Sequence, residues 1–192
     1  MANEKEVSYT STNTYTTVNT LTPKTKNIWI AFHGLGYLSR YFAKYFKHLN
    51  PEENYIIIPQ APSKYYQGSN FKHVGASWLT KENTVAETKN VLKYIDAVWE
   101  VEKPEVMPNF IAMGYSQGVS IAIELKPEDF SFLKLDTTVT YLYGNKDPYI
   151  TEARKTEEQL KGSSLFGDRL QTSVFEGIHE VNTSFLQQIA TM

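Results

Sequence analysis

Residues 109–122 read NFIAMGYSQGVSIA, an apolar run that leads into a serine placed between two glycines. The run has the composition of a buried strand, and the residues after the second glycine have that of a helix. A G-x-S-x-G sequence between a strand and a helix is typical of a nucleophile elbow, a strained turn that exposes its serine at one edge of a parallel sheet. Glycines at 114 and 118 lack a Cβ, so neighbouring backbone can approach the turn. The sequence therefore predicts that Ser116 is a nucleophile.

A serine hydroxyl is a weak nucleophile, so this prediction requires a base and a carboxylate that orients the base. Chains with such an elbow place both groups after the serine, the carboxylate first and the histidine second. Asp147 lies in a turn-rich stretch after one apolar run, and His179 follows another. Each lies at the carboxyl end of a predicted strand, the sheet edge that also holds Ser116. We predict that Asp147 and His179 are the partners of Ser116.

Other residues are weaker candidates for these two roles. Three histidines lack the position and chain order that the base requires: His33, His48 and His73. Two carboxylates are reserve candidates for the acid: Asp168 and Glu180. The structural alternatives are a solvated loop histidine at 179 and an ordinary turn aspartate at 147.

The first predicted strand leads into His33-Gly34-Leu35-Gly36, a flexible turn. Acyl transfer requires N–H donors for the oxyanion that develops on the substrate. In chains with a nucleophile elbow, one donor comes from a turn of this kind and the other from the residue after the nucleophile. The predicted donors are therefore the backbone N–H groups of Leu35 and Gln117.

The same turn is a poor match to a dinucleotide-binding fingerprint. Ser39 stands where the third glycine of that fingerprint would be, and the next predicted strand ends in Pro59-Gln60 rather than in an acidic residue. The chain also has no G-x-x-x-x-G-K-[ST] sequence, and its histidines and carboxylates show no zinc-ligand spacing. We expect neither a cofactor nor a bound metal.

From Asn27 onward, short β-rich runs alternate with longer stretches of helical periodicity, which predicts βαβ units and a mostly parallel sheet. Strands are expected at 28–32, 55–59, 109–113, 137–143 and 171–175. Helices are expected at 38–49, 84–103, 117–125, 151–161 and 180–190. A capping-box pattern of Thr84 and Glu87 opens the second helix. Residues 8–20 suit an edge hairpin, and the whole chain, 1–192, is expected to form one domain.

Composition excludes several classes of protein. Apolar residues make up 41% of the chain and charged residues 21%, values typical of a globular protein. A net charge of −2 with scattered lysines disfavours a nucleic-acid partner. The absence of cysteine removes disulfides, thiolate metal sites and a cysteine nucleophile. Neither a secretory signal at the first residues nor an apolar run of membrane-spanning length is present, which favours a cytoplasmic protein.

The sequence resembles the phospholipase/carboxylesterase branch of the α/β-hydrolases, which includes carboxylesterases and acyl-protein thioesterases. Six landmarks carry the resemblance in the family's order: residues 33–36, Pro59-Gln60-Ala61-Pro62, Gly75-Ala76-Ser77-Trp78, the elbow around Ser116, the 144–148 turn and Gly177-Ile178-His179-Glu180. The resemblance implies an α/β-hydrolase fold, a mostly parallel sheet flanked by helices. It also implies cleavage of carboxylic esters through an acyl-enzyme, with Ser116, Asp147 and His179 in the triad positions.

The resemblance further implies that an aromatic group borders the substrate cleft: Trp78, Tyr65, Tyr66 and Phe71. From the residues alone, these aromatic side chains could equally serve to pack a long loop. Small-molecule esters are the implied substrates. The sequence does not specify the acyl chain, the choice between esters and thioesters, or the oligomeric state.

The chain departs from the family pattern between Ser116 and Asp147, where 147 − 116 = 31 residues are fewer than the family uses. The helix after the elbow is expected to end near Leu125, and residues 126–129 lead almost directly into the next strand. About one strand and its following loop are therefore missing from the predicted sheet. Either the sheet closes around the gap, or the carboxylate is displaced from His179.

The leading interpretation is a serine hydrolase that cleaves carboxylic esters or thioesters. A protein that keeps the fold for binding or interaction after losing activity is the alternative from another class, and the short interval favours it. An acyltransferase, which would pass the acyl group to an alcohol or amine, is a further enzymatic alternative.

Overall fold

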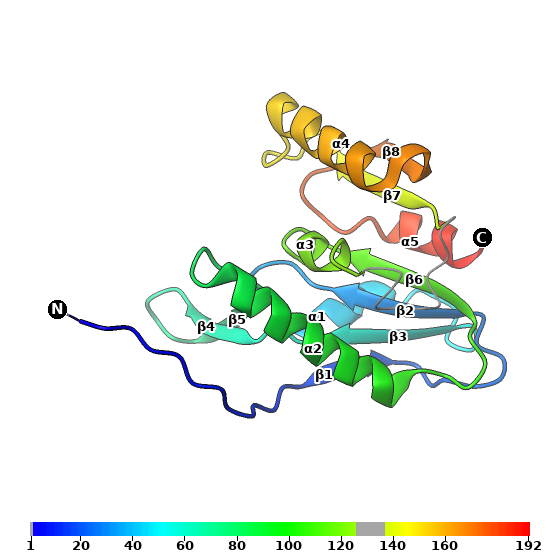
Figure 1. The fold of residues 1–192 in the computed structure, drawn as a ribbon. Helices are drawn as coiled ribbons and strands as arrows, with labels where there is room; N and C mark the ends of the chain where they lie inside the picture. Colours follow the sequence, from blue (N-terminus) through cyan, green and yellow to red (C-terminus); the bar gives the residue numbers. More distant parts are fainter. Residues whose placement is uncertain (1, 126–136) are drawn as a thin grey trace.

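A four-stranded sheet lies at the centre of the fold (Figure 1). The computed structural model describes residues 2–125 and 137–192. In spatial order the strands are β1 (Tyr15–Val18), β3 (Asn54–Pro59), β2 (Asn27–Phe32) and β6 (Asn109–Gly114). Strand β2 pairs in parallel with β3 and β6, while β1 pairs antiparallel with β3. Apart from one edge strand, the sheet is parallel, as the alternating pattern predicts.

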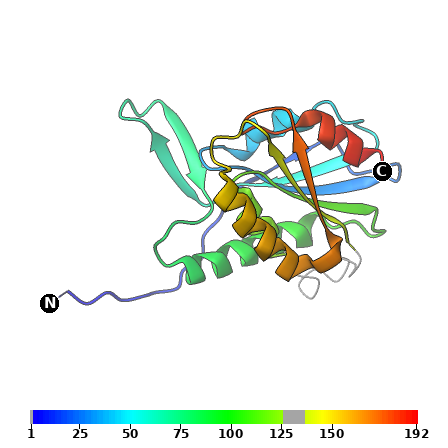
Figure 2. The same cartoon turned by 90° about the horizontal axis from the view of Figure 1, so that it is seen from above.

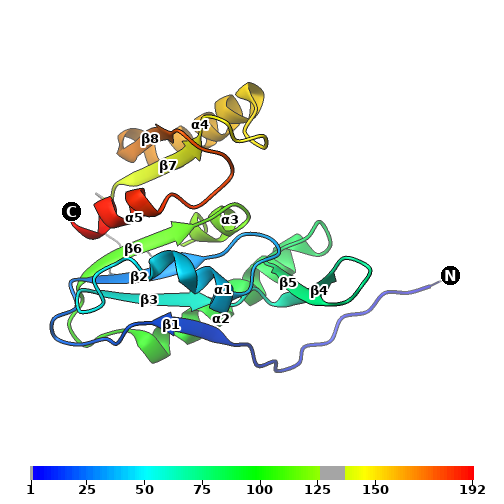
Figure 3. The same ribbon diagram turned by 180° about the vertical axis from the view of Figure 1, so that it is seen from behind.

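Strands β2 and β3 are buried along their whole length. Because successive side chains of a strand point to opposite faces, each strand contributes to two separate clusters of core residues. One cluster joins Ile28 and Ile30 to Ile95 of helix α2 (Thr84–Glu102). The other joins Trp29 to Phe42 and Leu186, on the opposite face. Helix α2 therefore covers one face of the sheet, and the short helix α1 with helix α5 covers the other (Figures 1 and 3).

The helix expected at 38–49 is shorter than its periodicity indicates. Helix α1 (Ser39–Phe42) passes directly into the 3₁₀ helix η1 (Ala43–Phe46). At the second helix the capping-box prediction is wrong, because Thr84 is the first helical residue and its hydroxyl donates to the Thr80 carbonyl at 2.9 Å. Asn83, at a φ of 48°, occupies the N-cap position without a side-chain bond.

The edge hairpin expected at 8–20 is also wrong. Only Tyr15–Val18 forms a strand, and its partner is β3 rather than a neighbouring segment of the chain. Residues 2–12 are exposed and extend away from the body of the molecule (Figure 1).

An antiparallel hairpin of β4 (Ser63–Gln67) and β5 (His73–Ser77) projects from the sheet (Figure 2). The sequence predicted only an aromatic-rich loop here. Every residue of β4 is exposed, so the strand has no buried face to give it an alternating pattern.

The C-terminal unit, residues 139–175, is a parallel strand pair with a helix. It consists of β7 (Val139–Gly144), α4 (Glu152–Phe166), the 3₁₀ helix η2 (Gly167–Arg169) and β8 (Leu170–Phe175). Among the described residues, β6 is hydrogen-bonded only to β2, and β7 only to β8. Within the described residues, the sheet is therefore interrupted between β6 and β7, and the predicted loss of a strand falls on a stretch that includes residues outside the description. The expected turn at 126–129 lies outside the described residues.

Two further helices each follow a strand. Helix α3 (Gly118–Ala122) follows β6 and is shorter than the predicted 117–125, and α5 (Thr183–Ala190) follows β8 and returns to the main sheet. Within the described ranges, no helix is both long and apolar enough to cross a membrane.

Candidate active site

Ser116 lies on a sharp turn between β6 and α3. Its φ of 53° is in the left-handed region, which is strained for a residue with a side chain, and the residue is exposed. The turn is tight because the two flanking glycines lie against other backbone. A Cβ at Gly118 would lie 2.1 Å from the Phe32 carbonyl oxygen, and one at Gly114 would lie 2.5 Å from the Val119 Cα. Only glycine fits at either position, and this gives the turn the geometry of a nucleophile elbow.

Asp147 and His179 are in contact despite the short interval before Asp147. The Nδ1 atom of His179 lies 2.7 Å from Oδ2 of Asp147. Only 5% of the aspartate side chain is exposed, against 26% of the histidine side chain. The other carboxylate oxygen of Asp147, Oδ1, accepts a hydrogen bond from the Tyr149 backbone N–H at 2.9 Å. A carboxylate held in this way can accept a proton-bearing Nδ1, an arrangement that would leave the lone pair of Nε2 free.

The loops that carry these two residues are held together by their backbones. The N–H of Asn145 donates to the Phe175 carbonyl, and that of Lys146 donates to the Gly177 carbonyl, each at 2.9 Å. In return, the Asn145 side-chain oxygen accepts from the Gly177 N–H at 3.2 Å. Because β7 and β8 are parallel neighbours, their carboxyl ends bring the two loops to the same edge.

His179 lies beside the residue that precedes the serine. The Tyr115 hydroxyl donates to the His179 carbonyl at 2.9 Å, and the two rings are 5.2 Å apart. Burial raises the pKa of Tyr115 to about 12, so its hydroxyl stays protonated as a donor. The Tyr149 ring packs edge-on against His179 at 4.9 Å. No hydrogen bond joins the Ser116 hydroxyl to His179 within the described chain. Catalytic hydrogen bonds of this kind are often long before substrate binds.

The turn of residues 33–36 lies against the elbow. A Cβ at Gly34 would lie 3.2 Å from the Ser116 Cβ. The N–H groups of Leu35 and Gln117 have no hydrogen-bond partner in the part of the chain that the structure describes. By contrast, the N–H of Gly36 donates to the Ala76 carbonyl at 2.8 Å. Of the two predicted oxyanion donors, one is therefore an unpaired N–H next to Ser116 in the chain, and the other is an unpaired N–H in the turn that lies against the elbow.

The side chain of Gln117 fixes the elbow to the segment after β5. Its Oε1 accepts from the Trp78 backbone N–H at 2.9 Å, and its Nε2 donates to the Ser77 hydroxyl at 3.0 Å and to the Leu79 carbonyl at 2.8 Å. Sequence reasoning used only the backbone of Gln117 and missed this role. An amide directly after the elbow serine, with both donor and acceptor atoms, was the available signal.

His33 is a buried residue beneath the same turn. Its Nδ1 donates to the Gly34 carbonyl at 2.9 Å, and its Nε2 accepts from the Ala61 N–H at 3.1 Å. Burial lowers the pKa of His33, so the ring is neutral and both nitrogens are used for structure. His33 therefore fixes the turn and is not available as a base.

The four aromatic residues expected at the cleft do not form one group. Trp78 is 0% exposed, and its indole N–H donates to the His33 carbonyl at 2.7 Å. A side chain with no exposed area cannot touch a substrate, so the structure contradicts the expected cleft position of Trp78 and gives it a packing role. Tyr65, Tyr66 and Phe71 are exposed on the projecting hairpin, where the rings of Tyr66 and Phe71 meet edge-on at 5.4 Å.

The two reserve carboxylates do not take the place of Asp147. Asp168 lies in η2, just before β8, and therefore at the opposite end of that strand from His179. Glu180 is exposed next to the histidine in the chain. The described ranges contain no group of three histidine or acidic side chains that could hold a metal ion.

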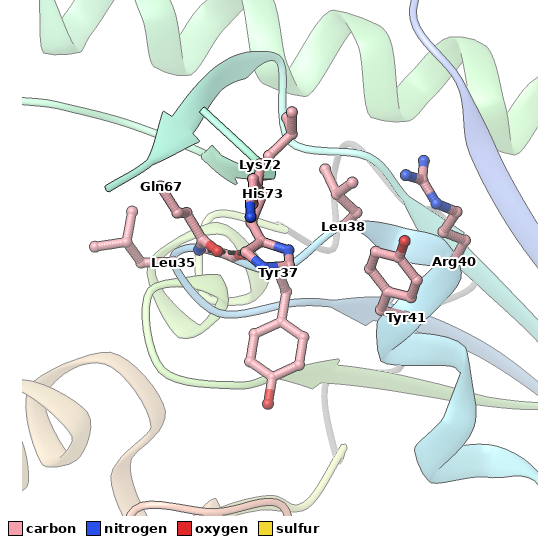
Figure 4. Close-up of a pocket in the computed structure, with 10 residues that line it drawn as sticks. Leu35, Tyr37, Leu38, Arg40, Tyr41, Gln67, Lys72 and His73 are labelled. Atoms are coloured by element: carbon pink, nitrogen blue, oxygen red, sulfur yellow. Dashed lines mark hydrogen bonds between the residues drawn. The ribbon is translucent and has the colours of Figure 1, made fainter. Parts of the chain in front are cut away.

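A cavity of about 420 Å³ lies beside the 33–36 turn (Figure 4). Its walls come from that turn, from α1 and from the hairpin. The lining side chains include Leu35, Tyr41, Arg40, Gln67, Lys72 and His73.

Comparison with solved structures identifies the fold. The chain is similar to acyl-protein thioesterase 2 of Zea mays, with a TM-score of 0.67 and 12% identity over 94% of this chain and 97% of that one. It is also similar to a carboxylesterase of Bacillus cereus, with a TM-score of 0.65 and 14% identity over 93% and 92% of the two chains. A phospholipase/carboxylesterase of Dyadobacter fermentans gives a TM-score of 0.63 and 17% identity over 96% and 99%. No protein-family model and no curated protein matches the sequence. The chain has an α/β-hydrolase fold.

Proposed function

We propose that this α/β-hydrolase-fold chain is a serine hydrolase of the phospholipase/carboxylesterase type that cleaves carboxylic esters. The observation that carries the proposal is the 2.7 Å contact of His179 with Asp147, beside an exposed serine on a strained turn. A neutral imidazole oriented by a buried carboxylate is the base that a serine nucleophile needs. The names of the similar structures, esterases and a thioesterase, support the same class of reaction.

In the proposed mechanism, Nε2 of His179 takes the proton of the Ser116 hydroxyl while Oγ bonds to the ester carbonyl carbon. The carbonyl oxygen becomes an oxyanion and accepts hydrogen bonds from the Leu35 and Gln117 N–H groups. Collapse of this intermediate breaks the bond to the alcohol, which leaves with the proton from His179. Asp147 stabilises the imidazolium while it exists.

In the second half of the reaction, water attacks the acyl-enzyme by the same steps. His179 deprotonates the water, and the same two N–H groups hold the second oxyanion. As the bond from the acyl carbon to Ser116 Oγ breaks, His179 returns the proton to Oγ and the acid departs. A thioester would follow the same steps with a thiol as leaving group. An alcohol or amine acceptor in place of water would make the chain an acyltransferase, which analysis of the products distinguishes.

The test uses a fluorophosphonate probe, which reacts only with an activated serine. We expect labelling of the wild-type protein at Ser116, none of Ser116→Ala, and hydrolysis of short p-nitrophenyl esters that depends on the same residue. Circular dichroism of both proteins checks that they are folded. A folded wild-type protein that is neither labelled nor active would contradict the proposal.

A binding protein without activity is the second candidate, and the interruption between β6 and β7 favours it. Asp147 belongs to the C-terminal unit, whereas Ser116 belongs to the main sheet. A small rotation of the unit would separate His179 from the serine without unfolding either part. The fluorophosphonate experiment separates the two candidates.

A further inference from the structure

Residues 7–81 carry many more basic side chains than acidic ones. Between residues 7 and 81 the only acidic residues are Glu52 and Glu53, against eight lysines and arginines. Both glutamates form ion pairs, with Lys24 at 3.4 Å and with Lys26 at 2.6 Å.

These ion pairs lie at the far end of the sheet from the site. The Glu53 carbonyl accepts from the N–H groups of Lys26 and Asn27, at the start of β2, whereas the turn with Leu35 follows the end of β2. Within residues 7–81, the end of the sheet that bears the turn therefore receives basic side chains and no carboxylate.

Two of these basic side chains, with a histidine, line the cavity beside the turn. Arg40 comes from α1, and Lys72 and His73 come from the hairpin, so the groups approach the cavity from separate elements (Figure 4). The cavity lining contains no aspartate or glutamate. Neither Arg40 nor Lys72 forms an ion pair with any residue that the structure describes.

The positions of these groups are partly fixed. The Arg40 guanidinium lies over the Tyr41 ring at 4.8 Å. The hairpin is tied to the turn by Gln67, whose side-chain N–H donates to the Gly36 carbonyl at 2.8 Å. The contact with Tyr41 restricts the Arg40 guanidinium, and the Gln67 bond fixes the backbone segment that carries Lys72 beside the cavity.

The cavity and the reactive centre share one wall. Gly34 packs against Ser116, while Leu35 and Gly36 line the cavity. Two residues of extended chain span about 7 Å at most. A substrate whose carbonyl accepts from the Leu35 N–H can therefore reach the cavity with a chain of a few carbon atoms.

We propose that this cavity is a subsite for a carboxylate on the substrate, so that the chain prefers esters that carry a free carboxylate a few bonds from the ester group. The inference rests on the proposed function, because it assigns a substrate class to the same site. Arg40 offers a planar fork that matches a carboxylate, and Lys72 adds a second charge. The carboxylate is on either the acyl or the alcohol part of the ester, and the experiment distinguishes the two.

The test compares charged esters with neutral esters of the same shape. Monomethyl glutarate carries its carboxylate in the acyl part, and the methyl ester of glutaric monoamide is its neutral match. The ester 4-acetoxybutanoate carries its carboxylate in the alcohol part, and 4-acetoxybutanamide is its neutral match. We expect kcat/KM for at least one charged ester to exceed that of its match by about tenfold at low salt, and the excess to shrink as salt is added.

The variants Arg40→Gln and Lys72→Gln should each lower this ratio about fivefold, and the double variant should remove it. The readout is the ratio of kcat/KM for each charged ester to that for its neutral match, and not either rate alone. Lys47→Gln is the matched control, because Lys47 is exposed near the end of η1 and does not line the cavity. It alters the net charge equally and should leave the ratio as in the wild type.

Failure of the subsite differs from failure of the proposed function. Hydrolysis of charged and neutral esters at equal rates, with Ser116 still required, overturns the subsite alone. If no ester is hydrolysed, calorimetric titration of the Ser116→Ala protein with glutarate decides the subsite. Binding weakened by Lys72→Gln and not by Lys47→Gln supports it, and absence of binding overturns it.

Discussion

The contact of Asp147 with His179 gives the most direct test at the scale of a residue. In Asp147→Asn the amide no longer selects the productive tautomer of the imidazole or stabilises its charged form, so kcat should fall about 10³–10⁴-fold. Asp168→Asn, a change of the same kind at the reserve carboxylate, should leave kcat unchanged. Steady-state hydrolysis of a p-nitrophenyl ester measures both variants, and equal losses would contradict the assignment of Asp147.

His33 should make the stability of the protein depend on pH. Burial lowers the pKa of His33, so below about pH 6.5 the unfolded chain binds a proton that the folded chain does not. The free energy of unfolding should therefore decrease as the pH falls below that value, by at most about 1.4 kcal/mol per pH unit from this residue. Urea denaturation of the wild type at pH 7.5 and pH 5.5 measures the decrease.

In His33→Asn this contribution is gone, so the difference between the two pH values should be smaller even if the variant is less stable throughout. His48→Asn, at an exposed histidine, is the control and should retain the wild-type difference. An unchanged difference in His33→Asn would show that another group is responsible.

Gly118 allows close packing of the elbow against β2, and substitution by alanine tests this role. In Gly118→Ala the new Cβ would meet the Phe32 carbonyl oxygen, so the elbow must shift and the free energy of unfolding should fall by about 3 kcal/mol or more. At Gly68, with a φ of 75° and no atom near the added Cβ, Gly68→Ala should cost only about 1 kcal/mol of backbone strain. Equal losses in urea denaturation would mean that the close approach at the elbow is relieved by other movements.

At the scale of elements, Glu102 ties the end of α2 to two strands. Its carboxylate accepts hydrogen bonds from Tyr15 of β1 and Tyr55 of β3. Loss of two charge-assisted bonds in Glu102→Ala should lower the free energy of unfolding by about 2–3 kcal/mol. Glu100→Ala, which removes only an exposed ion pair with Lys103, should cost less than about 0.5 kcal/mol. A loss in Glu102→Ala no larger than the control would contradict the role of this tie.

The elements that the sequence predicts well are those with an apolar run or a helical period. The strands β2, β3 and β6 and the helix α2 lie within two residues of their predicted bounds, because such a run or period is visible in the residues. Strand β4 has no such pattern, because all its residues are exposed and are held by hydrogen bonds to β5 and to the 33–36 turn. Hydrogen bonds between exposed strands do not produce an alternation of apolar and polar residues in the sequence.

Some features of the candidate site could be predicted from the sequence and others could not. The elbow at Ser116 and the chain order of Asp147 and His179 are properties of sequence, so their residues could be named before their contacts were known. The side-chain bonds of Gln117 to the 77–79 segment are properties of packing, and so is the burial of Trp78. Contacts between distant segments are not encoded in any local pattern.

At the scale of the whole molecule, the C-terminal unit has little core in common with the main sheet. Neither cluster of buried apolar residues includes a residue of β7 or β8. We therefore expect the amides of β7 and β8 to exchange with deuterium through openings of lower free energy than those of β2 and β3. Hydrogen exchange followed by mass spectrometry measures this, and equal protection of the two strand pairs would show that they unfold together.

The interruption between β6 and β7 also determines how the reactive geometry is maintained. The hydroxyl to be activated and the carboxylate that orients the base come from bodies without a common interior, and Tyr115 and the loop of His179 are the contacts that bring them together. Mild conditions that break those contacts would abolish the proposed activity while the main sheet and the C-terminal unit both stay folded. We therefore expect the proposed activity to be lost before either part of the molecule unfolds.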